Sequence, residues 1–163
     1  TAVPPNLTIF ILFRILGAKF EDALLCLQKE FALRLVAEPD TDDYARLSVM
    51  AQNAADIQLL GEVPRFAFNP VPKVDSALVY LEKNKKFDLD EALVPLLFQH
   101  KNQTVKNALW HSRKKLAVPE DRLKLELPLL PFASKNPRSL TLQEIAELSV
   151  AFRKLGTWPV PKP

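Results

Sequence analysis

Hydrophobic and polar positions follow two different periods along the first half of the chain. Apolar residues recur at the helical spacing in residues 7–16 and again in 31–37, whereas residues 22–28 form one short, continuous apolar run. Such a run is typical of a strand buried on both faces. A helix at 44–53 and strands at 56–63 and 74–82 are predicted next. This order of helices and strands indicates part of an α/β sheet.

From residue 83 onward the apolar spacing is helical throughout. A stripe of five apolar residues opens this region: Leu89, Ala92, Leu93, Leu96 and Leu97. A second stripe runs from Val105 to Leu116. We therefore predict an α/β part over residues 1–84 and a small all-α domain over residues 85–163, which ends in a proline-rich tail.

The last helix has the clearest start signal. Thr141 is placed as its N-cap and Glu144 follows three positions later, which is the spacing of a capping box. Leu140 and Ile145 flank this start as a hydrophobic staple. Gly156 is placed to end the helix.

Charge is unevenly distributed, although the formal net charge of the chain is only +3. Residues 21–63 contain nine acidic and three basic residues, whereas residues 100–124 contain seven basic and two acidic ones. The basic segment favours a polyanionic partner, and a solvated helix face has the same composition.

Composition disfavours several kinds of site. His100 and His111 are far apart in sequence and have no Cys or His at ligand spacing, so we expect neither a metal site nor a histidine-activated nucleophile. Three glycines cannot supply a glycine-rich phosphate loop.

Cys26 is expected to be a buried small side chain, and a chain without disulfides fits the cytoplasm. No apolar run is long enough to span a membrane, no signal peptide is expected, and the missing initial methionine suggests a fragment.

Two loops carry candidate binding chemistry. Gln28, Lys29 and Glu30 follow the run at 22–28, and ligands of open α/β sheets bind at the carboxyl ends of strands. The segment 66–74 presents Phe66, Phe68 and Lys73 on a proline-rich backbone, which suits a stacked base with a nearby phosphate. Two aromatic residues that close off the core would give the same pattern.

Two longer motifs are more specific. The first runs from Gln28 through Tyr44 to Val49 (QKEFA, RLVA, YARLSV), and the second is FxPxPKVxS from Phe68 to Ser76. Weaker matches lie at 98–105 and 137–141. Together these segments resemble the ribosomal RNA adenine dimethyltransferases, which modify two neighbouring adenines near the end of small-subunit RNA. The resemblance covers roughly residues 6–155.

The resemblance implies a fold and a cofactor. It implies the C-terminal part of a Rossmann-like class I methyltransferase sheet, followed by a helical RNA-binding domain, with S-adenosylmethionine as the methyl donor. The family's glycine-rich donor loop and first strands lie upstream of the residues present here, so most of the donor site is missing from this chain. Counted back without a gap, the family's target-adenine motif, Asn-Leu/Ile-Pro-Tyr/Phe, falls on Ala2, Val3, Pro4 and Pro5. Either the hydrogen-bonding Asn and the stacking aromatic residue are both replaced there, or residues are missing between Pro5 and Asn6.

The resemblance also implies roles for individual residues. Phe68 would hold a flipped-out adenine from its second face, with Gln28, Lys29 and Glu30 at the substrate. Seven basic residues would meet RNA phosphates: Arg46, Lys73, Lys101, Lys106, Arg113, Lys114 and Lys115. The expected partner is small-subunit ribosomal RNA in an assembling particle, and the expected protein is a cytoplasmic monomer without a metal.

Three hypotheses follow from these observations. In the first, the parent protein dimethylates N6 of two adjacent adenines and this chain alone is inactive. In the second, the chain is a non-catalytic module that binds RNA or the ribosome on the same scaffold. In the third, it is a transcription-factor relative that uses the scaffold on DNA, and a preference for duplex DNA over ribosomal RNA would favour it.

Overall fold

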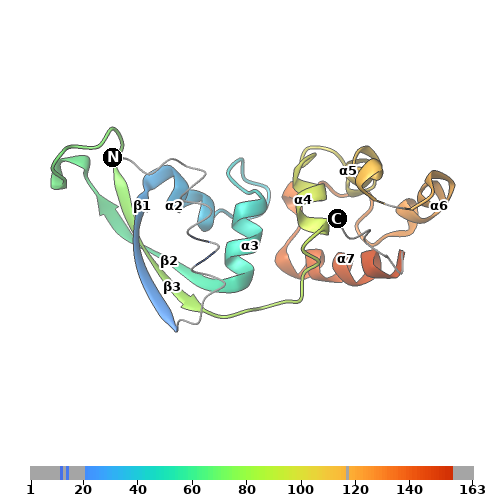
Figure 1. Cartoon of the computed structure of the whole chain (residues 1–163), viewed down its shortest axis with the longest axis horizontal. Helices are drawn as coiled ribbons and strands as arrows, with labels where there is room; N and C mark the ends of the chain where they lie inside the picture. Colours follow the sequence, from blue (N-terminus) through green and yellow to red (C-terminus); the bar gives the residue numbers. More distant parts are fainter. Residues whose placement is uncertain (1–11, 13, 15–20, 117, 156–163) are drawn as a thin grey trace. The chain divides into compact units, whose positions relative to one another are not determined.

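The computed structural model describes residues 12, 14, 21–116 and 118–155 of the chain, which forms two compact units (Figure 1). The sheet unit contains residues 1–38 and 47–86, and the helical unit contains residues 39–46 and 87–163. Most of the helix expected at 7–16, and the whole of Ala2–Pro5, lie outside the described residues. Leu12 is helical and buried in the core of the sheet unit.

Three strands form the sheet: β1 (Asp22–Gln28), β2 (Ala55–Val63) and β3 (Ser76–Lys83). β3 lies between the other two and is antiparallel to both, in the order β1-β3-β2 (Figure 1). Val79 of β3 is paired with Leu25 on one side and with Leu59 on the other. The three predicted strands are therefore confirmed, to within a few residues at their ends.

Two helices of the sheet unit precede β2: α2 (Lys29–Leu35) and α3 (Arg46–Ala54). Their apolar residues pack with alternate residues of the strands in one core cluster, which includes Phe31, Leu35, Ala51, Val79 and Leu81. Alternation places these strand residues on a single face of the sheet. Burial of one large apolar side chain in such a cluster contributes about 1.5–3 kcal/mol.

β1 differs from the expectation that it is buried on both faces. Its exposure alternates: Leu25 and Leu27 are half-buried, whereas Leu24 is 60% exposed and Cys26 is exposed. The predictions of two-sided burial and of a buried cysteine are therefore wrong. The physical reason is that, among the described residues, the core of this unit lies on one face of the sheet.

All regular elements described after Lys83 are helical. The α-helices are α4 (Leu93–Phe98), α5 (Val105–His111), α6 (Glu120–Glu126) and α7 (Leu142–Leu155). Short 3₁₀ turns connect them: η2 (Arg113–Lys115), η3 (Leu127–Leu129) and η4 (Pro137–Ser139).

α4 begins later than its apolar stripe predicts. Leu89 is buried, but the helix starts at Leu93. The reason is local, because the carboxylate of Asp90 accepts the backbone N–H groups of Ala92 and Leu93 at 3.0 and 2.9 Å and so satisfies the first donors of the helix.

The predicted capping box of α7 is confirmed in both directions. Thr141 Oγ1 accepts the N–H of Glu144 at 3.2 Å, and Glu144 Oε2 accepts the N–H of Thr141 at 3.0 Å. The two staple residues, Leu140 and Ile145, are both fully buried.

The segment Pro39–Arg46 belongs to the helical unit although it joins α2 to α3. Tyr44 is fully buried, its Oη donates a hydrogen bond to the carbonyl oxygen of Leu140 at 2.9 Å, and its ring meets that of Phe98 edge-on. Arg138 pairs with Asp40 and Asp42. The sequence-based boundary at residues 84/85 assigned this segment to the first part of the chain, and these long-range contacts explain the difference.

Candidate RNA-binding site

Gln28, Lys29 and Glu30 lie together at the carboxyl end of β1 and the start of α2. They line a shallow cavity of about 240 Å³ together with Val74 and Asp75, which precede β3. The Lys29 N–H donates to the carbonyl oxygen of Asp75 at 3.0 Å. The structure thus brings the QKE segment against the end of the proline-rich loop, two regions about 45 positions apart in sequence.

Lys29 is engaged by a neighbouring strand. Its Nζ forms an ion pair with Glu62 Oε1 at 2.6 Å. The hydrogen bond to the Glu62 carboxylate raises the pKa of Lys29. Its charge therefore serves to hold the QKE segment against the end of β2, and the other polar residues that line the cavity are Gln28, Glu30 and Asp75.

The loop 64–75 is braced by its own hydrogen bonds. Asp75 Oδ1 accepts the N–H of Arg65 at 2.8 Å across the base of the loop. Residues Arg65–Ala67 form a 3₁₀ turn, η1, in which Phe68 donates its N–H to the carbonyl oxygen of Arg65 at 3.2 Å. The peptide bond Asn69-Pro70 is cis.

The two aromatic residues of this loop have different surroundings. Phe68 is half-buried and does not line the cavity formed by the QKE segment, whereas Phe66 is 74% exposed. The alternative in which both rings close off the core is therefore wrong for Phe66.

Sequence reasoning did not single out Glu62 or Asp75. Glu62 lies near the end of β2, and only the strand pairing brings it to Lys29. Asp75 carried a local signal, because an aspartate beside a proline-rich loop often accepts backbone N–H groups of that loop.

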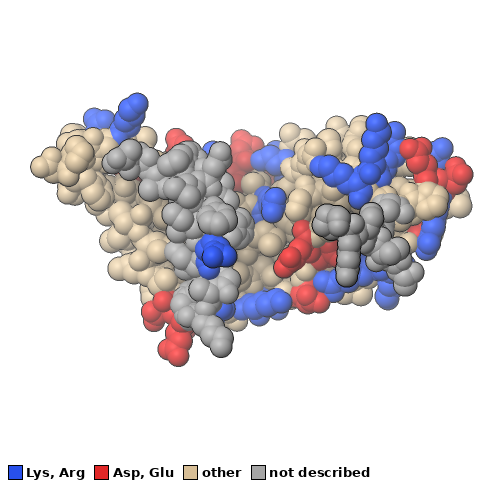
Figure 2. All heavy atoms as spheres, in the orientation of Figure 1, with Lys and Arg blue, Asp and Glu red and all other residues tan. Residues whose placement is uncertain are grey.

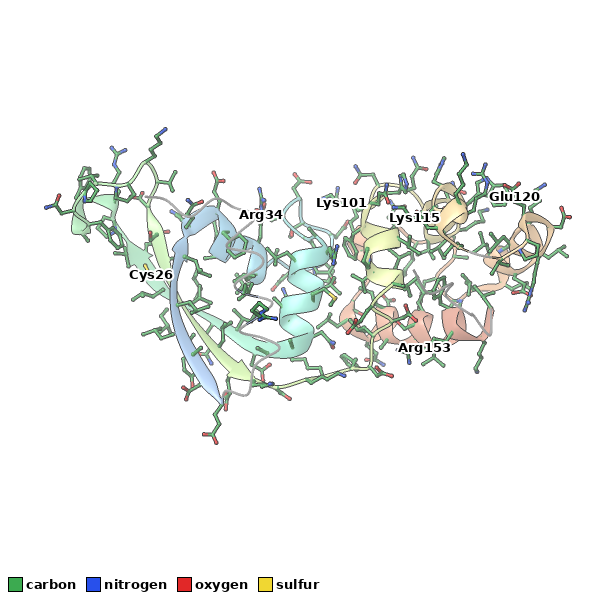
Figure 3. The ribbon with its side chains drawn as sticks, viewed as in Figure 1. Cys26, Arg34, Lys101, Lys115, Glu120 and Arg153 are labelled. Atoms are coloured by element: carbon green, nitrogen blue, oxygen red, sulfur yellow. The ribbon has the colours of Figure 1, made fainter. Side chains whose placement is uncertain are left out.

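Lys101, predicted to meet RNA phosphate, also makes hydrogen bonds within the helical unit (Figure 3). Its Nζ donates to the carbonyl oxygens of Asp42 at 2.8 Å and Tyr44 at 3.4 Å. Its own carbonyl oxygen accepts the N–H of Arg138. Lys101 therefore helps to fix the Pro39–Arg46 segment, although these neutral carbonyl oxygens leave its positive charge in place.

Two further basic residues of the helical unit are partly engaged. Arg113 pairs with Glu120 at 2.8 Å and its guanidinium carbon lies 4.8 Å from the centroid of the Trp110 ring. Lys115 Nζ donates to Gln99 Oε1 at 2.8 Å. These contacts are exposed, so they hold the side chains in place without neutralising the surface fully.

Four of the predicted basic residues are exposed and make no ion pair with any residue that the structure describes: Arg46, Lys73, Lys106 and Lys114. Figure 2 shows Lys and Arg side chains gathered over the α4 and α5 part of the helical unit. Lys106 lies in α5 and Lys114 in η2 directly after it, which makes them the strongest phosphate-binding candidates of the set.

The two histidines come together although they are distant in sequence. Their ring centroids lie 5.2 Å apart, His100 after α4 and His111 at the end of α5. No group of three or more His, Cys, Asp or Glu side chains within the described ranges is arranged to hold a metal ion. The turn between the two helices produces this pair, and no spacing rule reveals it.

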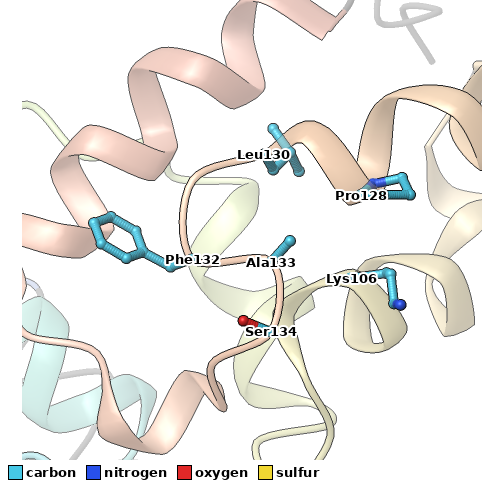
Figure 4. Close-up of a pocket in the computed structure, with 6 residues that line it drawn as sticks. All are labelled: Lys106, Pro128, Leu130, Phe132, Ala133 and Ser134. Atoms are coloured by element: carbon cyan, nitrogen blue, oxygen red, sulfur yellow. The ribbon is translucent and has the colours of Figure 1, made fainter.

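A second cavity, of about 300 Å³, lies in the helical unit (Figure 4). Its lining includes Lys106, Pro128, Leu130 and Ala133, whereas the ring of Phe132 points away from these residues in Figure 4. Phe132 is nevertheless one of the residues that line the cavity, and it is half-buried.

Comparisons with known proteins point to one family. The family model described as ribosomal RNA adenine dimethylase matches residues 1–133. The chain is 38% identical over 157 residues to a probable ribosomal RNA small subunit methyltransferase A of Thermococcus gammatolerans, covering 94% of this chain and 56% of the relative. It is 39% identical over 158 residues to the protein of that name in Methanopyrus kandleri, covering 91% of this chain and 57% of that relative. The chain thus spans just over half the length of these relatives.

Solved structures agree with the fold described above. A dimethyladenosine transferase from Plasmodium falciparum has a TM-score of 0.76 at 26% identity, over 94% of this chain and 66% of the other. The 23S rRNA methyltransferase ErmE has a TM-score of 0.56 at 25% identity, over 91% of this chain and 62% of the other. The fold is therefore α/β and methyltransferase-like, with a small antiparallel sheet and helices.

Proposed function

The chain belongs to the ribosomal RNA adenine dimethylase family, and we propose that it forms the RNA-facing, C-terminal part of an S-adenosylmethionine-dependent methyltransferase. The parent enzyme dimethylates N6 of two adjacent adenines near the 3′ end of small-subunit ribosomal RNA during ribosome biogenesis. The observation that carries this proposal is the single cavity formed by Gln28–Glu30 and the end of the Phe68 loop. Both of its halves come from the motifs that resemble this family.

The target adenine lies at this cavity in our proposal. Phe68 does not itself line the cavity but lies on the loop whose end does, and in this proposal it contacts one face of the flipped-out base while Gln28 and Glu30 contact its edge. Lys29 keeps this segment in position through Glu62. The family's target motif falls on Ala2, Val3, Pro4 and Pro5, which lie outside the described residues.

The methyl donor does not fit the residues that the structure describes. The only described glycine, Gly61, lies in β2, so the described ranges contain no glycine-rich turn for a nucleoside. The cavity at Gln28 is lined on one side by a loop braced through Asp75, and our proposal assigns its other carboxylate, that of Glu30, to the target adenine. We therefore assign S-adenosylmethionine to the additional length of the parent protein.

The helical unit supplies the RNA-binding surface. Lys106 and Lys114 meet phosphates, with Arg113 and Lys115 beside them and Arg46 and Lys73 outside this group. The partner is the pre-ribosomal small subunit, and we propose that the protein acts as a monomer in the cytoplasm. The described part of the chain contains no helix that is long and apolar enough to cross a membrane.

Salt-dependent RNA binding tests this assignment. The chain is titrated onto a labelled RNA hairpin with the sequence of the small-subunit 3′ end, at several salt concentrations. Replacing Lys106 and Lys114 by Ala should weaken binding and reduce the slope of log K against log salt by about 1.4–1.8, because each phosphate contact contributes about 0.7–0.9.

The control removes the same charge elsewhere. Lys85 and Lys154 are exposed and lie outside the proposed surface, so Lys85→Ala with Lys154→Ala should leave the slope nearly unchanged. Equal effects of the two double variants would mean that net charge alone drives the binding, and the proposed surface would be rejected.

One observation favours a second function, a non-catalytic module that binds RNA or the ribosome on the same scaffold. Ala2 and Pro5 occupy the positions of the family's hydrogen-bonding Asn and stacking aromatic residue. Methylation of small-subunit RNA by the parent protein separates the two functions, since the non-catalytic module transfers no methyl group.

A further inference from the structure

Phe66 is an exposed aromatic residue next to the proposed adenine site. It is 74% exposed, although Phe68, two positions later, is half-buried. The Arg65 guanidinium group lies over one face of the Phe66 ring, and we propose that the other face stacks on the base of the unpaired nucleotide that neighbours the target adenine. This inference rests on the function proposed above and adds a binding site for a second nucleotide.

The backbone that carries Phe66 is held in place before any ligand binds. The Ala67 N–H donates to the carbonyl oxygen of Pro64 at 2.9 Å, and the Phe68 N–H donates to that of Arg65 at 3.2 Å. Asp75 Oδ1 holds the N–H of Arg65 at 2.8 Å. A ring presented on a pre-organised turn loses little conformational entropy when a partner binds, which favours a binding role over a chance exposure.

The charge beside the ring selects the kind of partner. The guanidinium carbon of Arg65 lies 5.0 Å from the centroid of the Phe66 ring. Lys73, on the same loop, is exposed and makes no ion pair with the described residues. An aromatic ring with an adjacent guanidinium group, on a loop that carries a further lysine, suits a nucleotide, which offers a π-face and a phosphate together. An apolar protein surface would leave both cations without partners.

Spacing along the chain matches spacing along the RNA. Residues two positions apart are separated by at most about 7 Å, because each residue spans up to about 3.6 Å. Successive charges of one nucleic-acid strand lie about 3.4 Å apart along the duplex axis, and an unstacked strand is more extended. Phe66 therefore lies within one or two nucleotides of a base held by Phe68.

A base analogue gives the direct test. The full chain is mixed with single-stranded RNA in which 2-aminopurine replaces the nucleotide next to the target adenine. Stacking on Phe66 should quench the fluorescence of this base, and Phe66→Ala should remove the quenching, whereas Phe68→Ala should retain most of it.

Affinity gives the second measurement. Phe66→Ala should raise the Kd for this RNA about fivefold or more, since stacking of one base on an aromatic side chain has an effect of this size. The salt slope should not change, because stacking releases no counterions. Phe66→Tyr should restore the affinity. Val71→Ala, on the same loop and 56% exposed in the native protein, should have no effect.

Each outcome is decisive. RNA binding that persists with a Kd within twofold after Phe66→Ala overturns this inference and leaves the proposed function standing. Absence of RNA binding by the unmodified chain overturns both. Loss of affinity in Val71→Ala equal to that in Phe66→Ala points to a general apolar surface, for a protein partner, and also overturns the inference.

Discussion

Tyr44 holds the Pro39–Arg46 segment through one buried hydroxyl group. Its Oη donates to the carbonyl oxygen of Leu140, and the side chain is fully buried. Tyr44→Phe should lower the free energy of unfolding by about 1–2 kcal/mol, because the buried carbonyl loses its donor. Urea unfolding followed by tryptophan fluorescence measures this. Tyr80→Phe is the control, because the exposed Tyr80 Oη lies 3.4 Å from Asp22; an equal loss there would contradict the argument.

The difference in free energy of unfolding between the native protein and Tyr44→Phe depends on pH. Burial, assisted by the negative charge of Glu144, raises the pKa of Tyr44 above its usual value. The unfolded chain releases this proton at about pH 10, whereas the folded chain retains it. The stability that the hydroxyl contributes is thus complete below about pH 10 and is lost as the pH rises further. The stability difference between native protein and Tyr44→Phe should therefore shrink above about pH 10.

At the scale of single residues, the sequence predicts which chemical groups are present, but it does not predict which residues they contact. Lys101 and Lys114 are both basic residues of one segment, yet only Lys101 is held by backbone carbonyl oxygens, and those belong to residues almost sixty positions away. Phe66 and Phe68 share one loop and differ in burial. Sequence alone cannot separate such pairs, because a long-range contact decides the role of each member.

The capping box and hydrophobic staple of α7 belong to a single helix. Four residues predict them: Leu140, Thr141, Glu144 and Ile145. Thr141→Ala should lower the free energy of unfolding by about 1 kcal/mol, because the Glu144 N–H loses its acceptor at the first turn. Thermal or urea unfolding measures the loss. Gln143→Ala, an exposed position in the same turn, is the matched control and should change stability by less than about 0.5 kcal/mol. A similar loss at both positions would mean that the cap contributes little.

Local signals of this kind explain which elements were predictable. The strands and α7 carry their own pattern of apolar residues and caps, so their positions followed from the sequence. α6 was not predicted, because Leu123 is the one buried residue among its seven, too few to make an apolar stripe. The exposure of Leu24 and Cys26 was also missed, since a continuous apolar run does not reveal how many faces of a strand are covered.

At the scale of the whole molecule, residues that are close in sequence can belong to different structural units. The change of period near residue 83 is real, and β3 ends at Lys83. The Pro39–Arg46 segment nevertheless belongs to the helical unit, because Tyr44 and the partners of Lys101 and Arg138 lie in it. A boundary drawn from periodicity alone cannot detect a short segment that is contributed to another unit.

We expect the 163-residue chain as a whole not to bind the methyl donor. Calorimetry with the 163-residue chain and S-adenosylmethionine should show no binding at micromolar concentrations, because the described residues include no glycine-rich turn and the chain covers just over half of its relatives. No methyl transfer to RNA should occur either. The longer parent protein should bind the donor under the same conditions. Micromolar binding by the chain itself would contradict the assignment of the donor to the additional length of the parent protein, and that assignment would have to be abandoned.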